Sequence, residues 1–158
     1  MAFFNTGCSE APPRSDAEFG ICDREDGTPA YTVLVHEPAW VATVLNPDTK
    51  DVTFTAIDNC IDLPKDRRRC DGMLTTVDTL YLVELKNKLA DWIPDALEQL
   101  ESTMELLREQ EDLTAFRFRK AFACNRRHRR FQEVGQERNL KCFREHGFRF
   151  DIHATITM

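Results

Sequence analysis

The stretch that decides the fold is "CDGMLTTVDTLYLVELKNK", residues 70–88. Two apolar and β-branched runs are separated by a turn at residues 77–78, which predicts a β-hairpin with a two-residue turn. Because side chains alternate along a strand, Glu84 and Lys86 share one face. In this register Asp71 lies directly opposite Glu84. We therefore expect two carboxylates and one amine to meet at one end of the hairpin.

The expected grouping has a specific chemistry. Like charges that face each other across a sheet destabilise it unless a cation lies between them. Asp71 and Glu84 suit Mg²⁺ or Mn²⁺, which bind hard oxygen ligands, keep several waters and take further ligands from substrate phosphate. Lys86 would offset the negative charge that develops on phosphorus. These residues indicate phosphodiester hydrolysis, although the same spacing also arises by chance in a salt-bridged hairpin on a solvated face.

Strands and helices are predicted on both sides of the hairpin. A meander of two or three strands is expected before it, and an amphipathic helix from Asp91, its N-cap, to about Glu109 follows it. A strand, a short helix and a closing strand complete the order, and a strand–helix–strand crossover favours parallel neighbours. The predicted fold class is α/β, with a mixed central β-sheet flanked by helices. The remaining predicted strands and helix cover residues 31–36, 40–46, 52–59, 116–125, 135–147 and 148–158.

Length and composition predict one domain over residues 1–158, since 158 residues with 42% hydrophobic content form one packed core. Residues 1–30 are expected to be an irregular entry with at most a short helical or hairpin piece, and residues 31–158 the α/β core. The first ten residues resemble neither a secretory signal nor a membrane span, which predicts a cytoplasmic protein with no membrane partner. Free thiols are therefore expected for Cys8, Cys22, Cys60, Cys70, Cys124 and Cys142.

The charge is divided unevenly along the chain. Residues 1–113 carry 10 Lys and Arg against 23 Asp and Glu, and residues 114–158 carry 11 against 4, so the net charges are −13 and +7. Basic residues interleaved with phenylalanines fit a nucleic-acid track, and the alternative is ion pairing with the acid-rich helix that precedes them. The predicted phosphate-binding residues are Arg67, Arg68, Arg69, Arg117, Arg119, Lys120, Arg126, Arg127, Arg129 and Arg130.

A second pattern repeats one spacing, Cys124-x₃-His128 and Cys142-x₃-His146. Four such ligands would suit a tetrahedral zinc site. The spacing is unusual for zinc, and arginines surround His128. The alternative, which we favour, is that the two cysteines are buried small apolar residues and the histidines lie on the surface.

The segment "RRRCDGMLTTVDTLYLVELKNK" resembles the core of the PD-(D/E)XK nuclease superfamily, with Cys70 in place of the motif proline. The likeness covers roughly residues 50–157 and includes "DALEQLESTMELL", in which Gln99 and Thr103 lie one helical turn apart. It is similar in particular to small bacterial proteins of unassigned function with a "CD…ELK…QL…T" layout. The resemblance implies a restriction-endonuclease-like core.

The resemblance also implies the function of particular residues. Asp71 and Glu84 would hold Mg²⁺, Lys86 would be the catalytic lysine and Gln99 a supporting residue. The enzyme would cleave nucleic acid, with DNA as the expected substrate and a homodimer as a candidate assembly. Many members carry a further upstream acid, for which the candidates are Glu10, Glu18, Glu25 and, at a strand end, Asp58. The absence of a clear match favours the alternative of an inactive nuclease-like fold that binds protein or nucleic acid.

Overall fold

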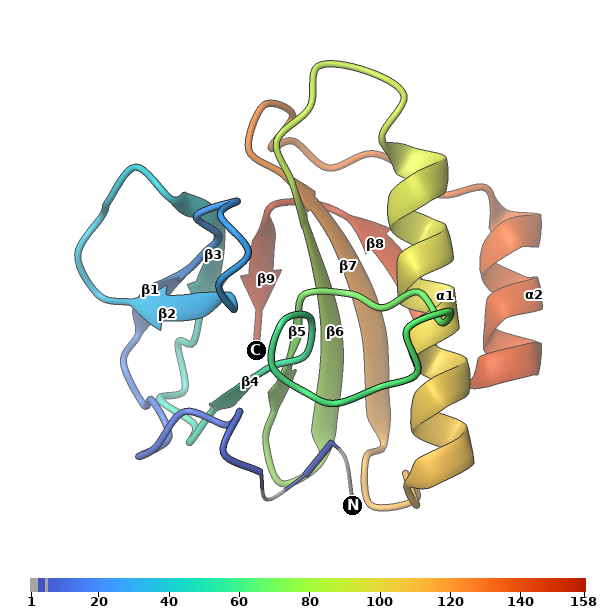
Figure 1. Cartoon of the computed structure of the whole chain (residues 1–158), viewed down its shortest axis with the longest axis horizontal. Coiled ribbons are helices and arrows are strands. Elements are labelled where there is room, and N and C mark those ends of the chain that lie inside the picture. The colour runs from blue at the N-terminus through green and yellow to red at the C-terminus, as the bar shows by residue number, and fades with distance from the viewer. Residues whose placement is uncertain (1–2, 5) are drawn as a thin grey trace.

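The computed structural model describes residues 3–4 and 6–158, arranged in three layers (Figure 1). Two helices form one outer layer, a five-stranded mixed sheet the middle, and a four-stranded mixed sheet the other outer layer. The middle sheet has the order β4-β5-β6-β7-β8, with strands Thr53–Ala56, Gly72–Thr75, Thr79–Lys86, Phe118–Asn125 and Arg149–Ile152. The outer sheet has the order β2-β1-β3-β9, with strands Tyr31–Val33, Glu18–Cys22, Trp40–Leu45 and Thr155–Thr157.

The predicted α/β class with a mixed sheet is confirmed, and the predicted flanking by helices holds for one face only. Strand β6 pairs antiparallel with β5 and parallel with β7, so the hairpin lies at the centre of the middle sheet. Leu82 packs under the helices, while Val83 and Leu85 pack against the outer sheet. Because β6 is covered on both faces, it is an unbroken apolar run up to the charged residues at its end.

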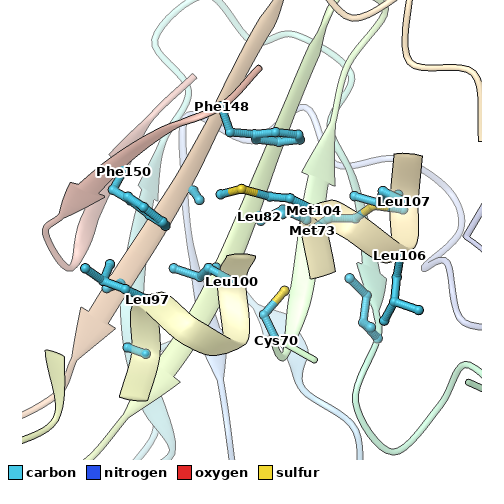
Figure 2. Close-up of a cluster of buried hydrophobic side chains, with 14 of the residues drawn as sticks. Cys70, Met73, Leu82, Leu97, Leu100, Met104, Leu106, Leu107, Phe148 and Phe150 are labelled. Atoms are coloured by element: carbon cyan, nitrogen blue, oxygen red, sulfur yellow. The ribbon is translucent and has the colours of Figure 1, made fainter. Parts of the chain in front are cut away.

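The two helices are α1, Ile93–Gln110, and α2, Gln136–His146. Leucines and a methionine at spacings of three and four turn one face of α1 onto the sheet, where they meet Phe148 and Phe150 (Figure 2). Gly147 ends α2 with a φ of 79°, a left-handed conformation that glycine adopts without a Cβ clash. No helix in the described part of the chain is long and apolar enough to cross a membrane.

The predicted N-cap of α1 is wrong. Asp91 has a φ of 56° and precedes the cap, which is Trp92 with no side-chain hydrogen bond to the first turn. Trp92 is instead buried in the core beneath the helix, so tertiary packing sets where α1 begins. Pro94 lies in the first turn as expected, where its missing N–H removes no helical hydrogen bond.

The entry segment is more ordered than predicted. It contains β1, which lies between β2 and β3 and pairs antiparallel with both. The expected meander over residues 31–59 is therefore wrong, because β1 separates β2 from β3 and β4 belongs to the other sheet. Gly20 allows this arrangement, since a Cβ there would lie 2.2 Å from Cδ2 of Trp40. A single strand from the entry thus organises the outer sheet.

The prediction of six free thiols is wrong for Cys8 and Cys60, which form a disulfide with their Cα atoms 5.9 Å apart. The backbone of Cys8 accepts a hydrogen bond from Ala56 N at 3.0 Å, and this pairing of the entry with β4 brings the two sulfurs together. Sequence spacing contains no sign of such an approach. The other four cysteines are free, as expected, and all four are buried.

Candidate functional site

The hairpin has the predicted register. Gly72 lies opposite Val83, and the turn closes at residues 77–78 through a hydrogen bond from Thr76 N to Thr79 O of 2.9 Å. Asp71, just before β5, is therefore placed beside Glu84 of β6. Its Oδ2 accepts a hydrogen bond of 2.7 Å from Leu85 N, which fixes the carboxylate against the strand.

Helix α1 fixes the segment that leads into Asp71. Thr103 Oγ1 accepts a hydrogen bond of 2.7 Å from Cys70 N, and Gln99 Nε2 donates one of 3.2 Å to the carbonyl of Arg69. Gln99 and Thr103 face the hairpin together because they lie four residues apart on the helix. Gln99 thus holds the backbone that leads into Asp71.

The amine of Lys86 lies at the centre of a network. Its Nζ is 3.2 Å from Glu84 Oε2, 2.6 Å from Asp95 Oδ2 and 2.5 Å from Gln99 Oε1. Burial opposes the charge, but the Glu84 carboxylate and hydrogen bonds to Asp95 and Glu84 outweigh it, so the pKa of Lys86 is raised. Lys86 is therefore an ammonium ion at neutral pH and acts as a cation and hydrogen-bond donor.

The two carboxyl groups of the hairpin are held in an environment that disfavours their charge. Burial first, and then the charge of Asp71, raises the pKa of Glu84. Burial also raises the pKa of Asp71 to about 7, although its hydrogen bond from Leu85 N works in the opposite direction. Glu84 is 2% exposed and its Oε1 has no hydrogen-bond partner in the described part of the molecule. Such an atom costs free energy unless something binds it.

Two further acids lie near this pair. Burial is the main cause of the raised pKa of Asp71, and the charges of Asp23 and Asp58 add to it. Asp58 was one of the predicted upstream acids. Asp23, which directly follows β1, was missed, because its place beside the hairpin depends on the packing of the outer sheet.

The other candidate acids lie elsewhere or at the edge of this group. Glu10 binds the backbone N–H and hydroxyl of Thr32, and Glu18 is exposed at the start of β1. Glu25 accepts a hydrogen bond of 3.1 Å from Asn87 Nδ2, just beyond Lys86. In the described chain, no hydrogen bond joins Glu10 or Glu18 to Asp71 or Glu84.

The predicted basic track is divided between the two ends of β7. Phe118 pairs with Thr79, and Asn125 pairs with Lys86. At roughly 3.3 Å per residue, residues 117–120 therefore lie about 20 Å from Lys86 along the strand. The loop that follows β7 lies beside the site, since Arg126 N donates a 2.9 Å hydrogen bond to Lys86 O. The loop carries Arg126, Arg127, Arg129 and Arg130, which we call the arginine loop.

The acids of α1 pair with different arginines from those expected. Arg68 bonds Asp95 and Glu98, and the guanidinium of Arg67 bonds Glu109. Arg69 donates to backbone carbonyls. At the far end of β7, Lys120 pairs with Asp151, Arg119 donates to the carbonyls of Leu113 and Phe116, and Arg117 stacks on Phe118.

The arginine loop differs from these residues in its lack of acidic partners. Within the described chain, none of its four guanidinium groups lies within ion-pair distance of a carboxylate, so the alternative of pairing with α1 does not apply to this loop.

The predicted zinc ligands do not meet. Cys124 packs between the two sheets and Cys142 under the helices, and burial raises the pKa of both thiols. The described residues contain one group of three metal-ligating atoms within 4.8 Å, from Glu101, Glu145 and His146. Glu101 is already engaged there by both guanidinium nitrogens of Arg138, at 3.0 and 3.2 Å. That group joins α1 to α2.

Comparisons of the chain with known protein families, with curated proteins and with solved structures find no match.

Proposed function

We propose that the chain is a metal-dependent nuclease of PD-(D/E)XK type that hydrolyses phosphodiester bonds in nucleic acid, DNA in the first instance. The observation that carries the proposal is the buried Oε1 of Glu84, which has no partner in the described chain although Asp71 lies beside it. Burial first, and nearby negative charge second, raise the pKa of both acids, and a divalent cation would satisfy the Glu84 oxygen and favour the charged form of both. The residues present therefore fit Mg²⁺ or Mn²⁺.

Each residue of the site has a role under this proposal. Asp71 and Glu84 would hold the metal, which when bound would supply positive charge beside the phosphodiester. Lys86, kept protonated by its neighbours, would donate hydrogen bonds to the phosphate as negative charge builds up. Gln99 orients the amine of Lys86 and the backbone before Asp71. Asp58 and Asp23 would add negative charge that favours cation binding.

The arginine loop supports nucleic acid as the substrate. The loop begins beside the backbone of Lys86, and its guanidinium groups are unpaired with carboxylates within the described chain, so they are available to phosphate oxygens. Arg67 and Arg68 already bond acids of α1 and would have to exchange partners to bind phosphate. The predicted phosphate contacts thus rest mainly on the arginine loop.

Calorimetric titration of Mn²⁺ tests the metal site without a guess about the substrate. We expect binding in the parent and its loss in Asp71→Ala. Asp78→Ala is the matched control, because Asp78 is an acid at the other end of the same hairpin and should leave binding unchanged. Equal binding by the parent and Asp71→Ala would contradict the assignment.

A second test addresses the reaction. With Mg²⁺ present, the parent should cleave DNA and Lys86→Ala should not, while Mn²⁺ binding by the variant persists. Cleavage that survives in Lys86→Ala would contradict the role given to the lysine.

A second candidate function is a nuclease-like fold that binds nucleic acid or protein without cleaving it. The observation in its favour is that all three hydrogen-bonding positions of the Lys86 ammonium are filled by Glu84, Asp95 and Gln99. Asp95→Ala distinguishes the two functions, because it would free the amine. Cleavage that appears or rises in this variant favours the nuclease, and its absence in both parent and variant favours the binding protein.

A further inference from the structure

Two hollows adjoin on the segment that follows β7. The first, of about 460 Å³, is lined by the arginine loop together with His128 and Gln132. The second, of about 500 Å³, includes Phe131, Gln132, Glu133, Gln136 and Asp151 in its lining. Gln132 lines both, so the two hollows meet at its side chain.

The first hollow has the chemistry of a phosphate site. The side chains of Arg126 and Arg130 have no hydrogen-bond or ion-pair partner in the described chain. Arg127 Nε donates to Asn87 Oδ1 at 2.9 Å, and Arg129 donates to the carbonyls of Arg126 and Trp40 at 3.4 Å, so neither charge is neutralised. Four uncompensated guanidinium groups around one concave surface attract phosphate oxygens.

The second hollow has a different character. Phe131 is 57% exposed, and its ring lies edge to face with that of His153, with the ring centroids 6.0 Å apart. Glu133 and Asp151 line the same hollow, and their charge disfavours phosphate there. The side chains of Gln132 and Gln136 make no hydrogen bond to the rest of the described chain. An exposed aromatic face beside free amide groups suits a neutral nucleobase.

We infer that these hollows bind one unpaired nucleotide of a single-stranded nucleic acid, with phosphates on the arginine loop and a base stacked on Phe131. In a duplex the base faces are covered by their neighbours, so only a single strand offers a base to Phe131. The inference rests on the proposed function, because it names the substrate class of that same site. The hydrogen bond from Arg126 N to Lys86 O joins the start of the arginine loop to the end of the strand that carries Glu84 and Lys86, so a strand bound there would lie on the side of the proposed metal site.

The experiment measures the anisotropy of a labelled single-stranded oligothymidylate in EDTA, so that neither metal binding nor cleavage contributes. We expect the single strand to bind at least tenfold more tightly than the corresponding duplex. Phe131→Ala should weaken single-strand binding by about tenfold, the scale of one lost stacking contact, and Phe131→Trp should keep it. Phe118→Ala is the matched control, since Phe118 is 50% exposed beside Arg117 at the far end of β7.

Removing bases from the oligonucleotide tests the stacking directly. Abasic sites should weaken binding by the parent and cause no further loss in Phe131→Ala. Arg130→Ala should weaken binding to strands with and without bases alike and reduce its dependence on salt concentration.

Equal affinity of the parent for single strand and duplex, or an unchanged affinity of Phe131→Ala, would overturn the inference. The outcome is separable from that of the proposed function. Metal-dependent cleavage with no effect of Phe131 leaves the nuclease and removes the nucleotide site. Binding to a single strand that depends on Phe131, without cleavage under any metal, leaves the nucleotide site and removes the nuclease.

Discussion

Replacing Asp71 by Asn is expected to stabilise the fold at neutral pH while abolishing metal binding. Folding raises the pKa of Asp71 from 3.8 to about 7, so the folded chain binds a proton more tightly than the unfolded chain. The free energy of unfolding then falls as the pH rises from about 4 to about 7 and is level above that range. Asn keeps the hydrogen bond from Leu85 N and never carries the unfavourable charge.

The size of the effect follows from the shift. About three pKa units at 1.36 kcal/mol each give an upper limit of roughly 4 kcal/mol at pH 8, and partial relaxation around the site brings the expected gain to about 2–4 kcal/mol. Near pH 4 the aspartic acid is protonated in the folded state and only about half ionised in the unfolded state, so the variant and the parent should there differ by less than about 1 kcal/mol. Loss of the Asp71 charge also relieves Glu84, which adds to the gain.

Urea denaturation of both proteins without metal, at pH values from about 4 to about 8, measures this difference. A difference that does not grow with pH, or an Asn variant less stable than the parent at pH 8, would refute the reasoning. Asp95→Asn is the control of opposite sign. Hydrogen bonds from Lys86 and Arg68 lower the pKa of Asp95. The stability that its carboxylate adds to the fold is therefore present at neutral pH and is lost as the pH falls through that lowered pKa.

Three further predictions concern the framework and the network. Thr103→Val should cost about 1–3 kcal/mol of unfolding free energy because Cys70 N loses its buried acceptor, and Thr103→Ser should restore most of it. Cys8→Ser should lower the free energy of unfolding by about 2–4 kcal/mol, because the disulfide to Cys60 spans 52 residues. Added dithiothreitol should abolish the difference from the parent, and a difference that persists in reductant would contradict this. Asp95→Asn should lower stability at pH 7 by an amount that shrinks in high salt, as chemical denaturation would show; a salt-independent loss would point to packing instead.

The fold was predictable where local pattern and tertiary packing agree. The hairpin of residues 70–88 was found with its register, because alternation and a two-residue turn leave one pairing that buries the apolar side chains. The strand β1 was not found, since "EFGIC" is short and its partners β2 and β3 follow it in sequence. Its place in the outer sheet comes from packing across layers, which no local pattern encodes.

The candidate site, like the fold, was predictable where local sequence pattern places its residues together. The predicted hairpin register was sufficient to bring Asp71, Glu84 and Lys86 together, whereas only the family resemblance pointed to Gln99 on the helix that follows. The partners of the arginines were not predictable. Arg68 and Arg126 look alike in sequence, yet Arg68 lies against α1 and bonds its acids, while Arg126 begins a loop that none of the acids of α1 reaches.

The final strand has a consequence for how the molecule assembles. After β8 the chain leaves the middle sheet and β9 pairs parallel with β3, Thr43 with Thr155, more than a hundred residues apart. On a ribosome, β5, β6 and α1 are made before β9, whereas β3 keeps one edge open until β9 has been made. A nascent chain therefore exposes a strand edge over that interval, which is the state most prone to pair with a neighbour.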